Sequence, residues 1–203
     1  MTEGLTEYLP PINAPGAAKY VGDVAKNYDA KRESSPKWVI EQRIITDMLS
    51  DLLEGTTVFD CPVGTGRFLQ FYVDKGFKIT GMDISGDMLK QAASRRLNMP
   101  KGGRPDGELR AGDVRNTGLP DKSFDVSVNC RITRWLSRED CVKMYREMQR
   151  IVKHRIIFTA RVRNHTHARG YELIEEALDG WQIYDDKPGV DMDYRIIQLR
   201  PVA

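Results

Sequence analysis

The stretch VFDCPVGTGRFL, residues 58–69, decides the fold. It begins as a short apolar strand and ends as the first turn of a helix, with Pro62, Gly64 and Gly66 between them. Glycine is required where a Cβ would collide with a ligand or forbid the backbone conformation. In an open α/β sheet such a turn lies beyond the carboxyl end of a strand, where ligands bind. We therefore expect a ligand to approach the backbone at Gly64 and Gly66.

Strands and helices alternate on both sides of this turn. Apolar residues at three- and four-residue spacing predict a helix over residues 36–53. The other expected elements are, in order, strand 56–63, helix 67–76, strand 77–85, helix 86–99, strands 108–114 and 124–132, helix 138–153, strand 155–162, helix 170–178, and two closing strands within 181–199 joined by a turn at 187–189. This order predicts an α/β fold: a doubly wound, mostly parallel seven-stranded sheet with an antiparallel last strand and helices on both faces.

The 203 residues predict a flexible N-terminal arm or lid over residues 1–35 and a single domain over 36–203, because prolines crowd the first fifteen positions. The formal net charge of +2 argues against bulk capture of nucleic acid. No apolar run is long enough to cross a bilayer and no secretory signal is visible, so we expect a cytoplasmic protein with no membrane partner. The three cysteines form no CxxC pair, so neither disulfides nor a zinc site is expected.

Three classes of ligand compete for the glycine-rich turn. A nucleoside triphosphate requires GxxxxGK[ST], and the stretch lacks that lysine. A dinucleotide requires GxGxxG, but Leu69 stands at the third glycine position. An adenosine fits better, because Asp83 ends the next strand 19 positions after Gly64 and can accept hydrogen bonds from a ribose diol. Asp113 ends the third strand and can accept from an exocyclic amine, beside the backbone N–H of Val114.

In this order the motifs resemble those of the class I S-adenosylmethionine-dependent methyltransferases, whose domain is Rossmann-like. DCPVGTG, residues 60–66, resembles the family's first motif, an acidic residue followed by GxGxG, with Pro62 at the first glycine position. GMDISGDML, residues 81–89, resembles the second motif, and AGDV, residues 111–114, resembles the adenine-binding segment. The resemblance implies S-adenosylmethionine as the cofactor. The cofactor-binding residues expected from the strand ends and the resemblance are Asp60, Cys61, Pro62, Gly64, Gly66, Asp83, Ile84, Met88, Asp113, Val114, Asn129 and Tyr28.

Some of these residues also fit structural interpretations. Read alone, Asp60 fits a helix cap, Asp113 an ordinary turn and Met88 a core position. In the resemblance, Ile84 and Met88 flank adenine, and Tyr28 approaches the carboxylate of the cofactor.

Methyl transfer from a sulfonium is an in-line displacement, so the enzyme chiefly orients the acceptor and excludes water. The residues expected around the acceptor are Arg131, Arg134, Trp135, Tyr20, Arg32 and Trp38. We expect the acceptor to be a small molecule or an exposed group, and the arginines indicate that it is anionic. Arg32 also fits a surface ion pair, and Trp38 also fits an anchor in the core. Arg131 and His165 are the candidate catalytic residues, since a general base is needed only for an acceptor that holds its proton. The pair His165 and His167 lacks a third ligand, so no metal is expected.

Two other functions stay open from the sequence: RNA methylation guided by the basic residues around 155–169, and a non-catalytic S-adenosylmethionine-binding regulatory partner. A solvated basic face is the simpler interpretation of those charges. Methylation of DNA amines is not expected, because NCRI, residues 129–132, replaces the Asn/Asp-Pro-Pro-aromatic motif that stacks a flipped base.

Overall fold

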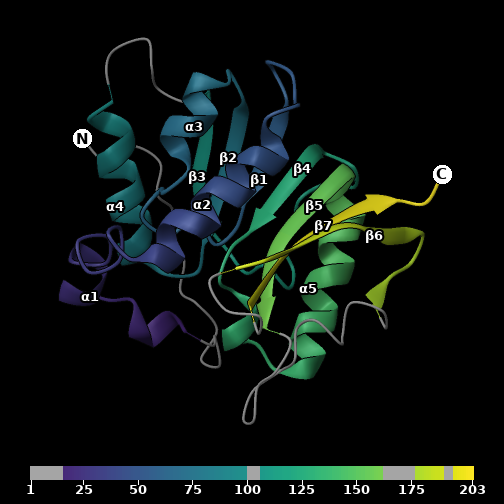
Figure 1. The fold of residues 1–203 in the computed structure, drawn as a ribbon. Helices are drawn as coiled ribbons and strands as arrows, with labels where there is room; N and C mark the ends of the chain where they lie inside the picture. The colour runs from purple at the N-terminus through teal and green to yellow at the C-terminus, as the bar shows by residue number, and fades with distance from the viewer. Residues whose placement is uncertain (1–15, 100–105, 162–176, 190–193) are drawn as a thin grey trace.

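A computed structural model describes residues 16–99, 106–161, 177–189 and 194–203 (Figure 1). The described strands form one seven-stranded sheet in the order β3-β2-β1-β4-β5-β7-β6. They are β1 (Thr57–Asp60), β2 (Lys78–Asp83), β3 (Asp106–Ala111), β4 (Phe124–Asn129), β5 (Val152–Arg161), β6 (Trp181–Pro188) and β7 (Tyr194–Pro201). Strands β1 to β5 pair in parallel, whereas β7 pairs antiparallel with β5 and with β6. The predicted mostly parallel sheet with an antiparallel last strand is confirmed.

The three long helices each begin after a serine. The helices are α1 (Asp23–Lys26), α2 (Pro36–Leu49), α3 (Leu69–Asp74), α4 (Gly86–Leu97) and α5 (Arg138–Ile151), with 3-10 turns η1 (Ala17–Lys19) and η2 (Thr133–Trp135). The side chains of Ser35, Ser85 and Ser137 each accept a hydrogen bond from the backbone N–H of the third residue of α2, α4 and α5, respectively. Each such cap typically stabilises a helix by about 1 kcal/mol. Within the described ranges, none of the helices combines the length and apolar character that a membrane crossing requires.

Successive strand residues point to opposite faces of the sheet, and each face carries its own core. Val58 packs in one cluster with Ile45 of α2 and Tyr72 of α3. The next residue, Phe59, packs in the other cluster with Met144 of α5. Helices therefore cover both faces, as the sequence predicts, and Figure 1 shows α2 and α5 on different sides of the sheet.

The strand order reverses between β1 and β4, because the chain leaves β3 at one edge and returns beside β1. In doubly wound sheets the ligand crevice opens at the carboxyl ends of the strands at this switch point. Strand β7 runs the other way, so its first residue reaches the same edge: Tyr194 pairs with Arg161, the last residue of β5. Residues from β1, β2, β4, β5 and β7 therefore meet at one edge.

Several predicted boundaries were wrong. Helix α3 begins at Leu69 instead of 67, because the turn that contains Gly66, whose φ is +80°, extends to Phe68. Strand β4 ends at Asn129 instead of 132, since Arg131 has a φ of +63°. Helix α2 ends at 49 and β3 covers 106–111 instead of 108–114. The predicted turn at 187–189 is also wrong, because residues 187 and 188 still pair with β7. The predicted helix 170–178 lies almost entirely outside the described residues.

Candidate active site

A cavity, termed the first cavity, lies at the carboxyl ends of β1, β2 and β4, where the strand order reverses. The space between its lining atoms is about 720 Å³ when the solvent at its open mouth is included. The predicted site residues that line it are Pro62, Gly64, Asp83, Ile84, Met88, Tyr20, Tyr28, Trp38, Arg131 and Trp135. The structure therefore brings together residues from the N-terminal segment, α2, the glycine turn, β2 and the loop after β4.

The two glycines of the glycine-rich turn, Gly64 and Gly66, have different roles. Gly64 lines the first cavity at a φ of +57°, and a Cβ added there would meet no atom within 4 Å. It leaves open space where a ligand can reach the backbone. Gly66 has a φ of +80°, but its added Cβ would lie 2.5 Å from Cδ1 of Leu69. The missing side chain at Gly66 thus makes room for Leu69, the residue that stands at the third position of the dinucleotide pattern.

Asp83 is fixed by the backbone of the glycine turn. Its Oδ2 accepts a hydrogen bond from the N–H of Gly64 at 2.9 Å, and its Oδ1 accepts from the N–H of Ser85 at 2.8 Å. Burial raises the pKa of Asp83 to about 6, and these hydrogen bonds oppose that rise. Each carboxylate oxygen keeps a further lone pair, so the side chain can still accept from a pair of ligand hydroxyls.

Three predicted cofactor residues lie beneath the cavity instead of on its wall. Asp60 is buried and accepts a hydrogen bond from the hydroxyl of Tyr72 at 3.1 Å. Burial and the nearby charge of Asp83 together raise the pKa of Asp60 to about 8, and the hydrogen bond from Tyr72 opposes this rise. The side-chain amide of Asn129 donates to the carbonyl oxygen of Cys61 at 2.8 Å. These contacts tie the ends of β1 and β4 together and support the cavity from below.

Asp113 and Val114 also lie outside the lining of the cavity. Both carboxylate oxygens of Asp113 accept from the guanidinium of Arg115, whose Nη1 donates to Asp140 at 2.7 Å. The N–H of Arg115 donates to Asp113 Oδ1 at 2.9 Å, a contact that closes a local turn. Val114 is buried in the core beneath α5. In this conformation the geometry matches the turn interpretation of Asp113.

The described part of the N-terminal segment packs on the ligand edge of the sheet. The hydroxyl of Ser85 donates to the carbonyl of Tyr20 at 2.6 Å, and the hydroxyl of Thr65 donates to Asp29 at 2.7 Å. Edge-to-face contacts join Tyr20 to Tyr28, with ring centroids 5.6 Å apart, and to Trp135 at 5.7 Å. This aromatic wall closes one side of the first cavity.

Two predicted acceptor residues hold aromatic rings without lining the first cavity. The guanidinium of Arg32 lies 4.0 Å from the ring centre of Tyr28, and that of Arg134 lies 4.8 Å from the ring of Trp135. Burial raises the pKa of Tyr28, so its hydroxyl stays protonated and able to donate. His165, the candidate base, lies outside the described residues.

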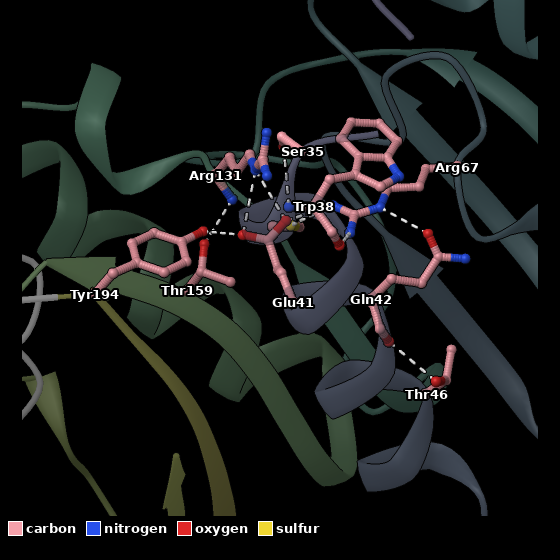
Figure 2. A network of polar contacts seen from close by, with 10 residues as sticks. Ser35, Trp38, Glu41, Gln42, Thr46, Arg67, Arg131, Thr159 and Tyr194 are labelled. Carbon is pink, nitrogen blue, oxygen red and sulfur yellow. Dashed lines mark hydrogen bonds and ion pairs between the residues drawn. The ribbon is translucent and has the colours of Figure 1, made fainter. Parts of the chain in front are cut away.

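The wall of the first cavity that contains Arg67 and Arg131 is held by a buried carboxylate (Figure 2). Glu41 is 1% exposed and accepts from Nε of Arg131 at 2.9 Å, from Arg67 and from the hydroxyl of Tyr194. The guanidinium of Arg67 stacks on the ring of Trp38 at 3.9 Å. Nη2 of Arg131 is buried and has no hydrogen-bond partner among the described residues. Among the described residues, two guanidiniums share this one carboxylate, which leaves one positive charge of the wall without a carboxylate partner.

Residues 58–155 match the family model described as a methyltransferase domain. This segment, just under half of the chain, is similar to methyltransferase domains. The demethylmenaquinone methyltransferase of Paenarthrobacter aurescens is 34% identical over 110 residues, which cover 52% of this chain and 39% of the relative. The malonyl-[acyl-carrier protein] O-methyltransferase of Serratia marcescens is 25% identical over 198 residues, 97% of this chain and 69% of the relative. The chain therefore spans between about two fifths and seven tenths of the length of these relatives.

Solved structures show the same architecture. Magnesium protoporphyrin IX methyltransferase from Synechocystis, solved with bound S-adenosylhomocysteine (SAH), superimposes with a TM-score of 0.65 at 15% identity, over 82% of this chain and 83% of that one. A methyltransferase from Aquifex aeolicus superimposes with a TM-score of 0.63 at 17% identity, over 86% and 98%. At these identities the likeness establishes the Rossmann-like fold.

The site contains residues that the sequence reasoning missed. The unpredicted lining residues are Gly16, Val63, Thr65, Arg67, Phe68, Cys130 and Ile132. The most important unpredicted residue is Glu41, which does not line the cavity but holds Arg67 and Arg131. A signal for it was present, because Glu41 falls between Trp38 and Ile45 on the buried face of α2. A charged residue on an apolar helix stripe requires a partner when buried.

Proposed function

We propose that this protein transfers a methyl group from S-adenosylmethionine to a small-molecule acceptor by in-line displacement. The observation that carries the proposal is the pairing of Asp83 with the side-chain-free backbone of Gly64 at the switch point of the sheet. A carboxylate at the end of the second strand suits a ribose diol. The family match and the SAH-bound structural neighbour support the same cofactor.

The described residues fit this cofactor. Asp83 would bind the ribose hydroxyls, with Ile84 and Met88 beside the adenine. The open space at Gly64 would admit the methionine part of the cofactor. The protonated hydroxyl of Tyr28 would donate a hydrogen bond to the carboxylate of that methionine part. When bound, S-adenosylmethionine supplies an electrophilic methyl group on a sulfonium. The adenine amine contact assigned to Asp113 stays a prediction, because Arg115 already pairs with that carboxylate.

The protein's own residues would orient the acceptor and exclude water from the reacting atoms. Tyr20, Tyr28 and Trp135 form an aromatic wall that excludes water from the reacting atoms. Arg131 is fixed by Glu41 and by its N–H, which donates to Thr159 at 2.7 Å. Since an arginine stays protonated in proteins, Arg131 would position the acceptor and would not act as a base.

We further propose that the acceptor is anionic. Arg67 and Arg131 share the single carboxylate of Glu41, so a negative group on the acceptor would balance the remaining charge. The Serratia relative is named for a malonyl acceptor, which carries a carboxylate. The cytoplasmic location expected from the sequence stays a prediction.

The proposal is tested by binding and by transfer. Dialysed protein should bind S-adenosylmethionine with a low-micromolar dissociation constant, and Asp83→Ala should weaken that binding, whereas Asp74→Ala, an exposed carboxylate elsewhere on the surface, should not. Incubation with methyl-labelled cofactor and fractionated cell extract should then label a small molecule. Equal binding by Asp83→Ala and the wild type, or label recovered only in RNA, would overturn the proposal.

A further inference from the structure

Asp113 lies at the ligand edge of the sheet, close to the carboxylate that the proposed function assigns to the ribose. The last residue pair between β2 and β3 joins Asp83 to Ala111, and the N–H of Gly112 donates to the carbonyl oxygen of Asp83 at 3.1 Å. Asp113 follows directly along the chain. Because neighbouring strands lie about 4.8 Å apart, a base attached to a ribose at Asp83 would lie near the end of β3.

The carboxylate of Asp113 has little capacity left for such a base. Its Oδ1 accepts from the backbone N–H of Arg115 at 2.9 Å and from Nε of the same residue at 3.0 Å. Its Oδ2 accepts from Nε at 3.0 Å and from Nη2 at 2.6 Å. An ionised carboxylate offers about four lone pairs, so these contacts with Arg115 fill both oxygens.

Arg115 is also held from its other side. Its Nη1 donates at 2.7 Å to Asp140, which lies in the first turn of α5. The side chain of Arg115 is 18% exposed and both carboxylates are 15% exposed, so water screens these pairs less than it screens surface pairs. Removing the guanidinium would leave two largely buried carboxylates without their counter-charge. We therefore expect Arg115 to stay on Asp113 when a cofactor binds.

The first cavity offers a base apolar contacts instead. Ile84 and Met88 line it beside Asp83, whereas Asp113 and Arg115 are not among its lining residues. Apolar contact suits any flat base and does not detect a single amine. A carboxylate that needed the hydrogen of that amine would reject a base without it, because its lone pair would stay buried and unpaired.

We propose that Arg115 sets the base selectivity of the cofactor site, by occupying the carboxylate that would otherwise bind the adenine amine. This inference rests on the proposed function, because it takes the first cavity as the cofactor site. Asp83 then selects for the ribose, and the base is held by apolar contact without recognition of its amine. Arg115 acts through Asp113 and does not touch the cofactor, so it is a positioning residue.

The test is a ratio of two dissociation constants measured by isothermal titration. The constant for the 6-deamino analogue of SAH, whose base is unsubstituted purine, is divided by the constant for SAH. The wild type should give a ratio within about twofold of one, because no hydrogen bond to the protein is lost with the amine.

Two variants show whether Arg115 is the cause. Arg115→Met removes the guanidinium and keeps the backbone N–H that closes the turn. Its ratio should rise to about ten, because the freed carboxylate of Asp113 gains a hydrogen bond from the amine of SAH alone. Adding Asp113→Ala to this variant should return the ratio to the wild-type value. Structural damage would weaken the binding of both ligands and leave the ratio unchanged.

The matched control is Arg150→Met. Its guanidinium also bridges two carboxylates, those of Glu147 at 2.7 Å and of Asp121, and it lies outside the lining of the first cavity, so the ratio should stay near the wild-type value. A wild-type ratio of about ten or more would overturn this inference without any variant, since it would show a hydrogen bond to the amine. An unchanged ratio in folded Arg115→Met would overturn it as well. Failure of the wild type to bind SAH would instead refute the proposed function.

Discussion

Cofactor affinity should depend on pH through Asp83. Burial raises the pKa of this carboxyl to about 6, and the ionised form accepts hydrogen bonds from a ribose diol better than the protonated form does. Above this pKa the affinity for SAH should be constant. At pH 5 only about one tenth of Asp83 is ionised, so the affinity should fall about tenfold, which corresponds to about 1.4 kcal/mol.

Isothermal titration with SAH between pH 5 and 8 measures this dependence. Asp83→Asn should bind about 30-fold more weakly at pH 8, because replacing two hydrogen bonds to a charged group by neutral ones loses about 2 kcal/mol. The same variant should show no pH dependence over this range. Asp60→Asn is the control, since that neighbouring carboxyl is neutral where Asp83 titrates and its loss should leave the midpoint near pH 6. A flat wild-type profile, or an unchanged profile in Asp83→Asn, would refute the reasoning.

Three further predictions concern the glycine turn and the buried carboxyls. Gly64→Ala should lower stability by about 1 kcal/mol and weaken SAH binding about tenfold, because its Cβ would enter open cavity space from a φ of +57°. Gly66→Ala should lower the free energy of unfolding by about 2 to 4 kcal/mol, because its Cβ would overlap Leu69 in the core. A larger loss in the urea unfolding midpoint for Gly64→Ala than for Gly66→Ala would contradict this order. Asp60 has a folded-state pKa of about 8, raised from its usual range, so its contribution to stability is present in acid and is lost as pH rises toward 8. The unfolding free energy of the wild type should thus fall by up to about 1.4 kcal/mol more per pH unit between pH 6 and 8 than that of Asp60→Asn, and parallel urea curves would disprove it. Glu41→Gln should destabilise the fold by about 3 to 5 kcal/mol, because Arg67 and Arg131 lose their counter-charge, and a change below about 1 kcal/mol in urea unfolding would show that the network is not structural.

The sequence predicted features whose causes are local. Alternating strands and helices predicted the sheet, and the family resemblance is confirmed by the domain match over residues 58–155. Gly64 was predicted because a backbone position with a positive φ favours glycine, and Asp83 because a carboxylate stands at the end of a predicted strand. Both residues line the first cavity. The boundaries failed where a single backbone angle decided them, as at Arg131.

Features that depend on which side chains meet in the folded protein could not be predicted. Glu41 meets Arg131 across 90 positions and Tyr194 across 153, and no short motif records such pairs. The GxG pattern also does not distinguish a glycine that makes room for a ligand from one, such as Gly66, that makes room for another side chain. Asp113 could not be assigned either, because Arg115, two residues away, pairs with its carboxylate in this conformation.

The reversed direction of β7 has an evolutionary consequence. Every parallel strand offers its last residues to the ligand edge, but β7 offers its first, Tyr194, while Ile196 and Ile197 continue into the two cores. Under the proposed function, sequence changes at the beginning of this strand would alter the acceptor side of the site and leave both cores intact. Related chains that differ in their acceptor would then be expected to differ where this one strand enters the sheet.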